Sequence, residues 1–346
     1  MNRAPTSYDV SVVVIGRNEG ERLRRCLDSV HAADWRHVSY ELIYVDSAST
    51  DDSDALARRA GARVLQAGGA HRNAAAGRNA GWRAAVADTV LFLDGDTVLD
   101  PAFPLHALAQ LDSGPYAAVW GHRREIAPRQ SLYTAVLDLD WIYAPGETDY
   151  CGGDVLFRRA ALAETGGFDE TFDAGEEPEL CRRVRAGGWR ILHVDAPMTR
   201  HDLAITRFGQ YWQRALRAGL AYAQVSARYA GSSDPLWRRE ARRNRVHGAL
   251  VLAAPFAWAA VLAVAPPAAL VLAALGAAIW LRSASRAYWK ARDWKLALLY
   301  ALHAHFQQVP ILVGQWRYRR AARAGRSAAA PQYKGADAGH VNREAS

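Results

Sequence analysis

The stretch Thr89-Val90-Leu91-Phe92-Leu93-Asp94-Gly95-Asp96 places two carboxylates directly after a run of apolar residues. Five β-branched and large apolar residues in succession predict a buried strand. The glycine lets the backbone turn tightly, so Asp94 and Asp96 can converge on one divalent cation at the carboxyl edge of a sheet. An ordinary acidic turn at the end of a strand is the alternative that this motif leaves open.

Strands and helices alternate around this stretch. Strands are predicted at residues 10–15, 41–45, 63–65 and 89–93, with helices at 19–30, 52–60 and 74–86 between them. Further strands are predicted at 117–121, 155–157 and 189–194, and further helices at 176–185 and 204–229. The alternation predicts an α/β fold of the nucleotide-binding type, with a mostly parallel sheet and helices on both faces.

The charge is divided unevenly along the 346 residues. Residues 236–346 hold 17 Lys and Arg against 4 Asp and Glu, whereas residues 1–235 hold 26 against 31. A basic segment beside apolar runs, behind an acidic front domain, favours anionic lipid over nucleic acid as the partner. The three cysteines show no metal-ligand spacing and indicate a reducing compartment.

The C-terminal third contains three apolar runs. Residues 246–264 carry no formal charge and are long enough to span about 30 Å of hydrocarbon. A second run, 268–281, follows Pro266-Pro267 and is shorter, and polar residues interrupt a third at about 296–313. Arginines on both outer flanks predict a hairpin over about 246–281 with those flanks in the cytoplasm. We interpret the third run as an interfacial helix, with a third span as the alternative.

We therefore divide the chain into a front domain over residues 1–235, a membrane-associated helical region over 236–320 and a disordered tail over 321–346. Residues 1–9 lack the apolar core of a signal peptide. The expected location is a bacterial inner membrane, with the front domain in the cytoplasm. A buried helical subdomain is the alternative for the apolar region.

Seven short motifs in a fixed order resemble the family 2 glycosyltransferases with the GT-A fold. They are Ser11–Glu19, Val45–Asp51, Gly77–Gly81, Asp94–Asp96, Gly166–Glu170, Gly175–Leu180 and Arg182-Arg183. The likeness covers roughly residues 10–230. It implies a metal-dependent transfer of sugar from a nucleotide sugar, as in polysaccharide biosynthesis.

The resemblance implies a nucleotide-sugar site at the ends of the first strands. Its members are Gly16, Asn18, Glu19, Asp46, Ser47, Arg78, Asn79, Asp94 and Asp154. Asp46 resembles the carboxylate that reads the base, which slightly favours a UDP-sugar, although Ser47 stands where many family members have a second aspartate. Arg78 and Asn79 resemble contacts to the diphosphate, and Asp154 is expected to bond sugar hydroxyls. The alternatives are a helix cap for Asn18 or Glu19 and a solvated helix face for Arg78.

Asp94 and Asp96 would then hold Mg²⁺ or Mn²⁺ across the diphosphate. His201 is expected to be a third metal ligand or a contact to the leaving diphosphate, and a surface histidine is its alternative. An inverting transfer also needs a carboxylate that takes the proton from the acceptor hydroxyl. Glu177 occupies the matching position, where the family has aspartate, and whether Glu177 or Glu176 reaches the acceptor stays open. Acidic residues also favour a helix N-terminus for electrostatic reasons alone.

The sequence thus predicts an inverting, metal-dependent glycosyltransferase that acts on a membrane-held glycan or lipid acceptor. Two alternatives remain. One is a nucleotidyltransferase on a similar fold, which would release pyrophosphate. The other is a membrane-anchored protein that binds a nucleotide sugar or a glycan without catalysis.

Overall fold

The computed structural model describes residues 8–68 and 72–326. They form two compact units, which we describe separately. The sheet unit contains the described chain up to Ile126 together with Tyr143–Leu203. The helical unit contains Ala127–Ile142 and the described chain from Ala204 onward. The predicted disordered tail lies outside the described residues beyond residue 326, and before that the last helix runs to Arg323.

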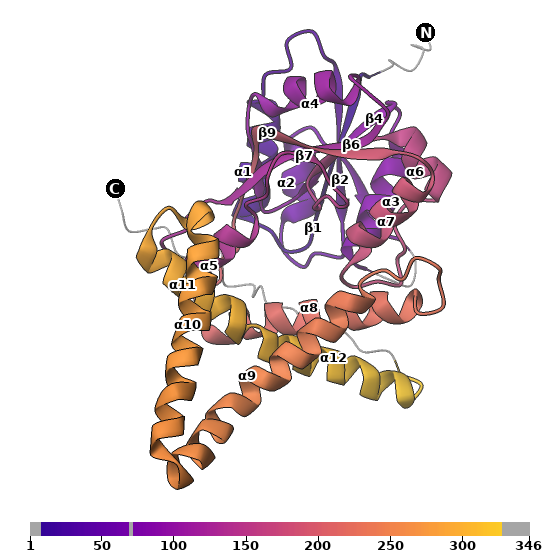
Figure 1. Cartoon of the computed structure of the whole chain (residues 1–346). Coiled ribbons are helices and arrows are strands. Elements are labelled where there is room, and N and C mark those ends of the chain that lie inside the picture. The colour runs from indigo at the N-terminus through magenta and orange to yellow at the C-terminus, as the bar shows by residue number, and fades with distance from the viewer. Residues whose placement is uncertain (1–7, 69–71, 327–346) are drawn as a thin grey trace, which may run out of the picture. The chain divides into compact units, whose positions relative to one another are not determined.

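The N-terminal half of the sheet is parallel, as the alternating pattern predicts. It consists of β1 (Val10–Gly16), α1 (Glu21–His31), β2 (Tyr40–Asp46), α2 (Ser53–Arg59), β3 (Arg63–Gln66), α3 (Ala74–Ala84) and β4 (Thr89–Asp94). The strands lie in the order β3-β2-β1-β4. They belong to the indigo and purple part of the chain in Figure 1. Because the chain moves outward from β1 and then returns to its other side, right-handed crossovers place α1 and α2 on one face and α3 on the other.

Register brings the polar ends of these strands together. Gly16 at the end of β1 pairs with Asp46 of β2, and Ile15 pairs with Asp94 of β4. Helix α3 packs close to β1 because Gly81 has no side chain: a Cβ there would lie 2.2 Å from a methyl group of Val13. The carboxyl edge of the parallel strands is therefore fixed by a fully buried core.

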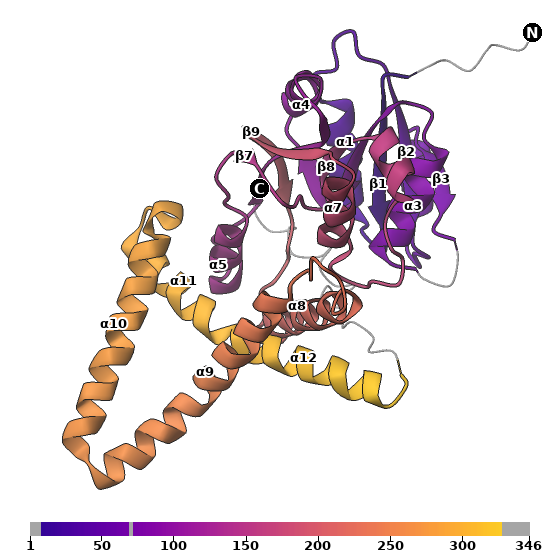
Figure 2. The same cartoon turned by 45° about the vertical axis from the view of Figure 1, so that its right-hand side comes forward.

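The other half of the sheet is mixed. Its elements are β5 (Thr97–Leu99), α4 (Phe103–Leu111), β6 (Tyr116–Glu125), β7 (Gly146–Glu147), β8 (Val155–Arg158), α6 (Arg159–Thr165), α7 (Glu176–Ala186) and β9 (Arg190–His201). Strand β8 lies antiparallel between β4 and β6, and β9 runs parallel to β6 but antiparallel to β5. Strands β7, β8 and β9 of this half are labelled in Figure 2. Periodicity did not predict β5, α4, β7 or α6, which are short.

Strand β9 continues well beyond the predicted end at residue 194. Its pairing with β6 shifts register around His122, which faces Pro197, and the irregularity lets a proline remain in a continuing strand. The strand therefore reaches His201, which pairs with Thr97 of β5. This extension brings a histidine to the sheet edge that holds Asp94 and Asp96.

The helical unit contains the remaining helices. They are α5 (Leu132–Asp140), α8 (Phe208–Arg228), α9 (Arg238–Val264), α10 (Pro266–Ala291), α11 (Trp294–Phe306) and α12 (Gln308–Arg323). Helix α8, which we expected in the front domain, belongs to this unit because it packs tightly against α12. At their crossing a Cβ on Gly219 would lie 2.2 Å from the carbonyl oxygen of Ile311, and a Cβ on Gly314 would lie 2.2 Å from that of Leu216.

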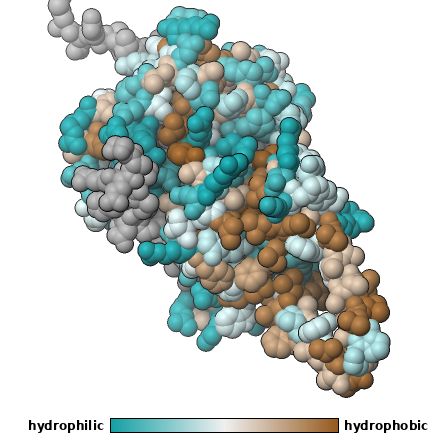
Figure 3. Space-filling view, turned by 90° about the vertical axis from the view of Figure 1, so that its left-hand side faces the viewer, coloured by the Kyte–Doolittle hydropathy of each residue, from teal (hydrophilic) through white to brown (hydrophobic). Residues whose placement is uncertain are grey.

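Three stretches of this unit have the length and apolar composition of membrane spans: Arg238–Val264, Pro266–Ala291 and Trp294–Arg323. The second is longer than the uncharged run suggested, because Pro266 and Pro267 occupy the first helical turn, where proline is tolerated. Its 26 residues correspond to about 39 Å. The third is broken near Gln307 into α11 and α12. Hydrophobic side chains gather at the end formed by α9 and α10 (Figure 3).

Candidate active site

The acidic pair lies where β4 leaves the sheet. Asp94 is the last residue of β4, and Asp96 lies in the turn before β5. The N–H of Gly95 donates to the carbonyl oxygen of Ile15 at 2.8 Å, and a Cβ on Gly95 would approach that oxygen to 3.0 Å. A side chain at Gly95 would therefore push the two aspartates away from β1, which is the physical reason for glycine between them.

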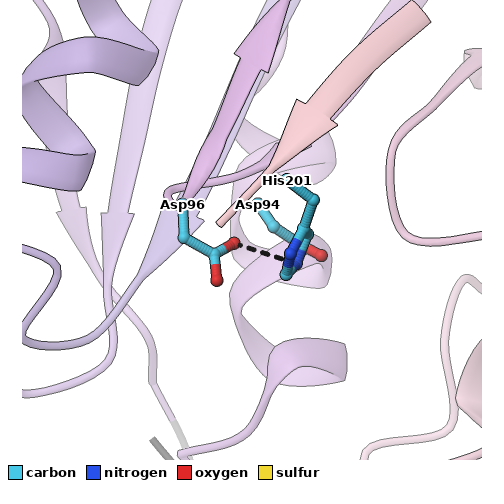
Figure 4. A group of neighbouring side chains, drawn as sticks. All are labelled: Asp94, Asp96 and His201. Carbon is cyan, nitrogen blue, oxygen red and sulfur yellow. Dashed lines mark ion pairs between the residues drawn. The ribbon is translucent and has the colours of Figure 1, made fainter. Parts of the chain in front are cut away.

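Asp94, Asp96 and His201 form a cluster with the donor set of a cation site. One ligand atom from each residue lies within 4.8 Å of those of the other two, and His201 Nε2 is 3.3 Å from Asp96 Oδ1 (Figure 4). Asp96 and His201 are buried, whereas Asp94 is partly exposed. Two carboxylates and one imidazole suit a divalent cation such as Mn²⁺ or Mg²⁺. The structure thus brings together the three residues predicted to hold metal.

Arg78 connects this cluster to the predicted base. Its guanidinium lies 2.9 Å from Asp94 Oδ1, 3.0 Å from Glu176 Oε1 and 3.4 Å from Glu177 Oε1, and its side chain is only 2% exposed. Burial opposes its charge, but the three carboxylates outweigh burial and raise the pKa of Arg78. The solvated helix face that we considered for Arg78 is therefore wrong. Its contact with a diphosphate stays a prediction.

Glu176 and Glu177 begin helix α7, directly after Gly175, whose φ is 90°. Glu176 is buried and its carboxylate bonds to Arg78, while the Glu177 side chain is 22% exposed. Burial and the neighbouring charge of Glu176 raise the pKa of Glu177 to about 7. A carboxyl group with this pKa can exchange protons near neutral pH. The Glu177 side chain is thus the more exposed of the two carboxylates, and which of them reaches an acceptor stays a prediction.

Asp154 holds the end of β4 in place. Its Oδ1 accepts the N–H of Asp94 at 2.9 Å, and its Oδ2 accepts the hydroxyl of Thr199 at 2.8 Å. Arg123 Nη2 lies 3.3 Å from the same Oδ2. Burial raises the pKa of Asp154. These bonds give Asp154 a supporting position beneath the acidic pair, and its bond to a sugar hydroxyl stays a prediction.

Sequence reasoning missed Arg123 and Thr199. Both lie in the mixed half of the sheet, where β6 and β9 bring them beside Asp154. Burial opposes the charge of Arg123, but Asp154 and Asp94 raise its pKa. The charged run His122-Arg123-Arg124-Glu125 at the end of a strand was a signal that could have found Arg123.

Two of the residues predicted to bind the nucleotide, Asp46 and Asn18, lie close together after β2 and β1. Asp46 accepts the N–H of Ser49 at Oδ2 and the hydroxyls of Ser49 and Tyr44 at Oδ1. Asn18 has a φ of 56°, its N–H donates to the Ser49 hydroxyl, and its Oδ1 accepts the N–H of Thr50. These bonds fasten the loop after β1 to the turn after β2.

The other predicted nucleotide residues border this network. Ser47 is buried and its N–H donates to the carbonyl oxygen of Gly16. Glu19 pairs with Arg22 at 2.9 Å, and its Cγ lies beside both Gly16 and Gly95. Glu19 therefore lies between Gly16 at the end of β1 and Gly95 in the turn after β4. The geometry agrees with a shared edge, while contacts to a donor stay predictions.

Asn79 is engaged inside the sheet unit. Its Nδ2 donates to the carbonyl oxygen of Phe168 at 2.8 Å and to Glu170 Oε1 at 2.7 Å, and its Oδ1 accepts the N–H groups of Phe168 and Trp82. The side chain fixes the loop that contains Gly166–Glu170 against α3. These bonds give Asn79 a structural role, and its contact with a diphosphate stays a prediction.

Comparison with known proteins agrees with this architecture. Residues 11–165 match the family described as Glycosyl transferase family 2. A pre-mycofactocin glycosyltransferase of Mycobacterium tuberculosis is 27% identical over 248 residues, which cover 67% of this chain and 50% of that protein. The chain thus spans about half the length of this relative. An uncharacterized glycosyltransferase of Mycobacterium bovis is 30% identical over 193 residues, covering 54% of this chain and 83% of that protein.

A solved structure has the same fold. The mannosyltransferase PcManGT from Pyrobaculum calidifontis, determined in complex with GDP-Man and Mn²⁺, superposes with a TM-score of 0.61 at 22% identity, covering 86% of this chain and 87% of that protein. The fold of the sheet unit is therefore GT-A. With the family match and the relative that is covered over most of its length, the chain belongs to the family 2 glycosyltransferases.

Proposed function

We propose that this protein transfers a glycosyl group, with inversion, from a nucleoside-diphosphate sugar to a glycan or lipid acceptor held in a membrane. The observation that carries the proposal is the Asp94, Asp96 and His201 cluster, joined through Arg78 to Glu177. This arrangement supplies a site for the donor diphosphate and a carboxylate for the acceptor within one network of charges.

The donor would lie along the edge formed by β1, β2 and β4. Ligands of open α/β sheets bind at the carboxyl ends of the strands, where Asp46 and Asn18 stand in this chain. Asp94, Asp96 and His201 would hold a divalent cation against the diphosphate. When bound, this cation would offset the negative charge of the leaving nucleoside diphosphate as a Lewis acid. The comparison structure contains GDP-Man, so GDP-sugars join UDP-sugars as donors to test.

Glu177 would act as the general base. In an inverting transfer the acceptor oxygen forms a bond to the anomeric carbon as the bond from that carbon to the diphosphate oxygen breaks, and the acceptor hydroxyl gives its proton to the base. Arg78 would keep Glu177 near the donor diphosphate, because it pairs with Glu177 and also with Glu176 and Asp94. Glu176 is buried in its bond to Arg78, which supports a positioning role for it.

The helical unit would attach the enzyme to the membrane. Stretches α9 and α10 satisfy the length and composition of spans, and only 6% and 11% of their most apolar windows are buried within the protein. Large apolar side chains such as Leu250, Phe256 and Leu270 are exposed there, at 64%, 72% and 70%. Exposed apolar area of this extent marks a membrane or partner surface. A bacterial inner membrane, with the sheet unit in the cytoplasm, is the proposed location.

The test is glycosyl transfer by the full chain in detergent, with UDP- and GDP-sugars, Mn²⁺ or Mg²⁺, and lipid extracts as acceptors. Released nucleoside diphosphate and the anomeric configuration of the product are measured. We expect Asp96→Asn and Glu177→Gln each to lower turnover by roughly 10²–10⁴-fold, because the first removes a ligand of the cation and the second removes the base. Asp88→Asn, at a side chain that is 98% exposed, is the matched control and should leave turnover unchanged.

Each alternative gives a different result. Full turnover of both site variants would exclude the assigned roles. Release of pyrophosphate would identify a nucleotidyltransferase. Donor binding in a calorimeter without transfer or hydrolysis under either metal would identify a binding protein.

A further inference from the structure

Arginines crowd one end of helices α9 and α12 in the helical unit. The first eight residues of α9 contain Arg238, Arg239, Arg242, Arg243 and Arg245 against the single carboxylate of Glu240. The last seven residues of α12 contain four arginines and no acidic residue. Two segments that are far apart in the sequence thus carry the same positive charge.

Helix α12 packs antiparallel against α9, so the two arginine groups meet. A Cβ on Gly248 of α9 would lie 2.4 Å from the carbonyl oxygen of Gln308, at the start of α12. Earlier in α9, Arg245 Nη1 donates to Gln315 Oε1 at 2.9 Å, further along α12. Residue numbers therefore fall along one helix as they rise along the other. Arg242 lies three residues before Arg245 on α9 and Arg319 lies four residues after Gln315 on α12, so each is one helical turn from this contact.

The resulting group, Arg242, Arg245 and Arg319, is a cluster of like charge. Arg319 and Arg242 lie close enough to act electrostatically on Arg245. Among the described residues, no carboxylate within 4.0 Å forms an ion pair with any of the three, whereas Arg78 in the sheet unit has three such partners. Three neighbouring guanidinium groups repel one another, and an anion bound between them would relieve that repulsion.

The cluster lies where the helices change from charged to apolar surroundings. In α9 the uncharged run begins at Val246, directly after Arg245, and its side chains at Leu250 and Leu252 are exposed. In α12 the Trp316 side chain is 55% exposed, and the Arg320 guanidinium lies over its ring at 5.4 Å. Tryptophan and arginine are typical of the boundary between hydrocarbon and lipid headgroups. The apolar side chains next to the cluster thus fit acyl chains, and the guanidinium groups fit phosphates.

We propose that Arg242, Arg245 and Arg319 form a binding site for the phosphate groups of anionic phospholipids, and this proposal rests on the proposed membrane attachment. Guanidinium groups bind phosphate through paired hydrogen bonds. Gln315 fixes the guanidinium of Arg245, so the site is partly preorganised. Arg242 and Arg319 are exposed and complete it from the two helices.

The experiment measures lipid binding to the full chain in neutral detergent by native mass spectrometry. Phosphatidylglycerol, phosphatidylcholine and inorganic phosphate are titrated separately. Wild-type protein should bind phosphatidylglycerol at least tenfold more tightly than phosphatidylcholine. The double variant Arg242→Gln with Arg319→Gln should weaken phosphatidylglycerol binding about 25-fold, at about fivefold for each charge, and leave phosphatidylcholine unchanged.

The matched control removes two exposed arginines from the sheet unit, Arg36→Gln with Arg59→Gln, and so has the same net charge. It should bind phosphatidylglycerol like wild type. An equal loss in this control, an unchanged double variant, or inorganic phosphate that binds as tightly as the lipid would each overturn the proposal. Carbonate extraction of cell membranes tests the attachment itself: protein that stays in the membrane without lipid preference contradicts only the phosphate site, whereas extracted protein contradicts the proposed tether.

Discussion

The arginines of the two units differ in how their charge is compensated. In the sheet unit Arg78 is almost fully buried and has three carboxylate partners. In the helical unit Arg242, Arg245 and Arg319 gather at a surface, and no described carboxylate pairs with them. A charge removed from water needs compensation inside the protein, whereas a charge at a surface can be compensated by solvent or by a ligand. The charge of Arg78 is therefore compensated inside the protein, whereas the arginines of the helical unit fit the proposed binding of an external anion.

The largest effect is expected when Arg78, the cation shared by three carboxylates, is removed. Arg78→Met leaves Asp94, Glu176 and Glu177 without their shared cation, and we expect it to lower the free energy of unfolding by about 3–5 kcal/mol. Thermal unfolding in detergent measures the change. Arg83→Met is the control, because the Arg83 side chain is 53% exposed and its pair with Glu170 is a surface pair. Equal stability of the two variants would contradict the structural role of Arg78.

The second effect addresses how the helical unit is held together. Gly314→Ala should destabilise it by about 1–3 kcal/mol, because the added methyl group would collide with the backbone of α8 at Leu216. Gly276→Ala on α10 is the control, since a Cβ there meets nothing within 4 Å and alanine favours the helix. Chemical unfolding followed by circular dichroism measures both. A destabilised control with an unaffected Gly314→Ala would show that the crossing of α8 and α12 is not close.

A smaller effect concerns the carboxylate that anchors α5 in the helical unit. Asp140 accepts the hydroxyl of Tyr300 at 2.9 Å and lies 3.4 Å from His303 Nε2. Burial opposes its charge, but these partners outweigh burial and lower the pKa of Asp140 below 3.8. The stabilisation is therefore present above the unfolded pKa and is lost as pH falls through the folded value.

We expect Asp140→Asn to cost about 1.5 kcal/mol at neutral pH and less in acid. Unfolding midpoints over a pH series give the answer, with exposed Asp88→Asn as the unaffected reference. A cost that stays constant down to about pH 3 would exclude a contribution from the charge.

The smallest effect is the pH dependence of turnover. Glu177 must be ionised to take a proton, and its raised pKa of about 7 predicts that kcat/KM falls about twofold from about pH 8 to about pH 7 and further below. The stability of the sheet unit should change in the opposite direction, since the folded protein keeps this proton between the unfolded value of 4.5 and about 7 and loses that stabilisation as pH rises. The rate and the unfolding midpoint are followed over the same buffers. A flat rate profile in this range would remove Glu177 as the base.

Much of the parallel half of the fold follows from local sequence. Apolar runs of strand length separated by helices specify β1, β2 and β4, because these strands are largely buried and each crossover must be right-handed, while β3 is a short, partly exposed edge strand. The sequence alone therefore places Asp46 and Asp94 at the carboxyl edge of the parallel strands. The uncharged run of α9 was equally plain, because 19 uncharged residues have few other uses, whereas the run of α10 was shorter than the helix that the structure shows.

The mixed half could not be derived in the same way. Strand β5 has three residues, and β9 passes through an irregular pairing at Pro197 before it reaches His201. The bonds of Asp154 to Thr199 and Arg123 join strands that are distant in sequence. Such contacts depend on pairing and register, which periodicity does not encode.

The sequence by itself determined the family, the acidic pair after β4, the carboxylates at the start of α7 and the apolar helices, because each is a local pattern of residue types. Only the tertiary structure decided that His201 joins Asp94 and Asp96, that Arg78 is buried among carboxylates, and that arginines from α9 and α12 meet in one cluster. These arrangements depend on distances between residues far apart in the chain, and those distances are set by strand register and by glycines at helix crossings.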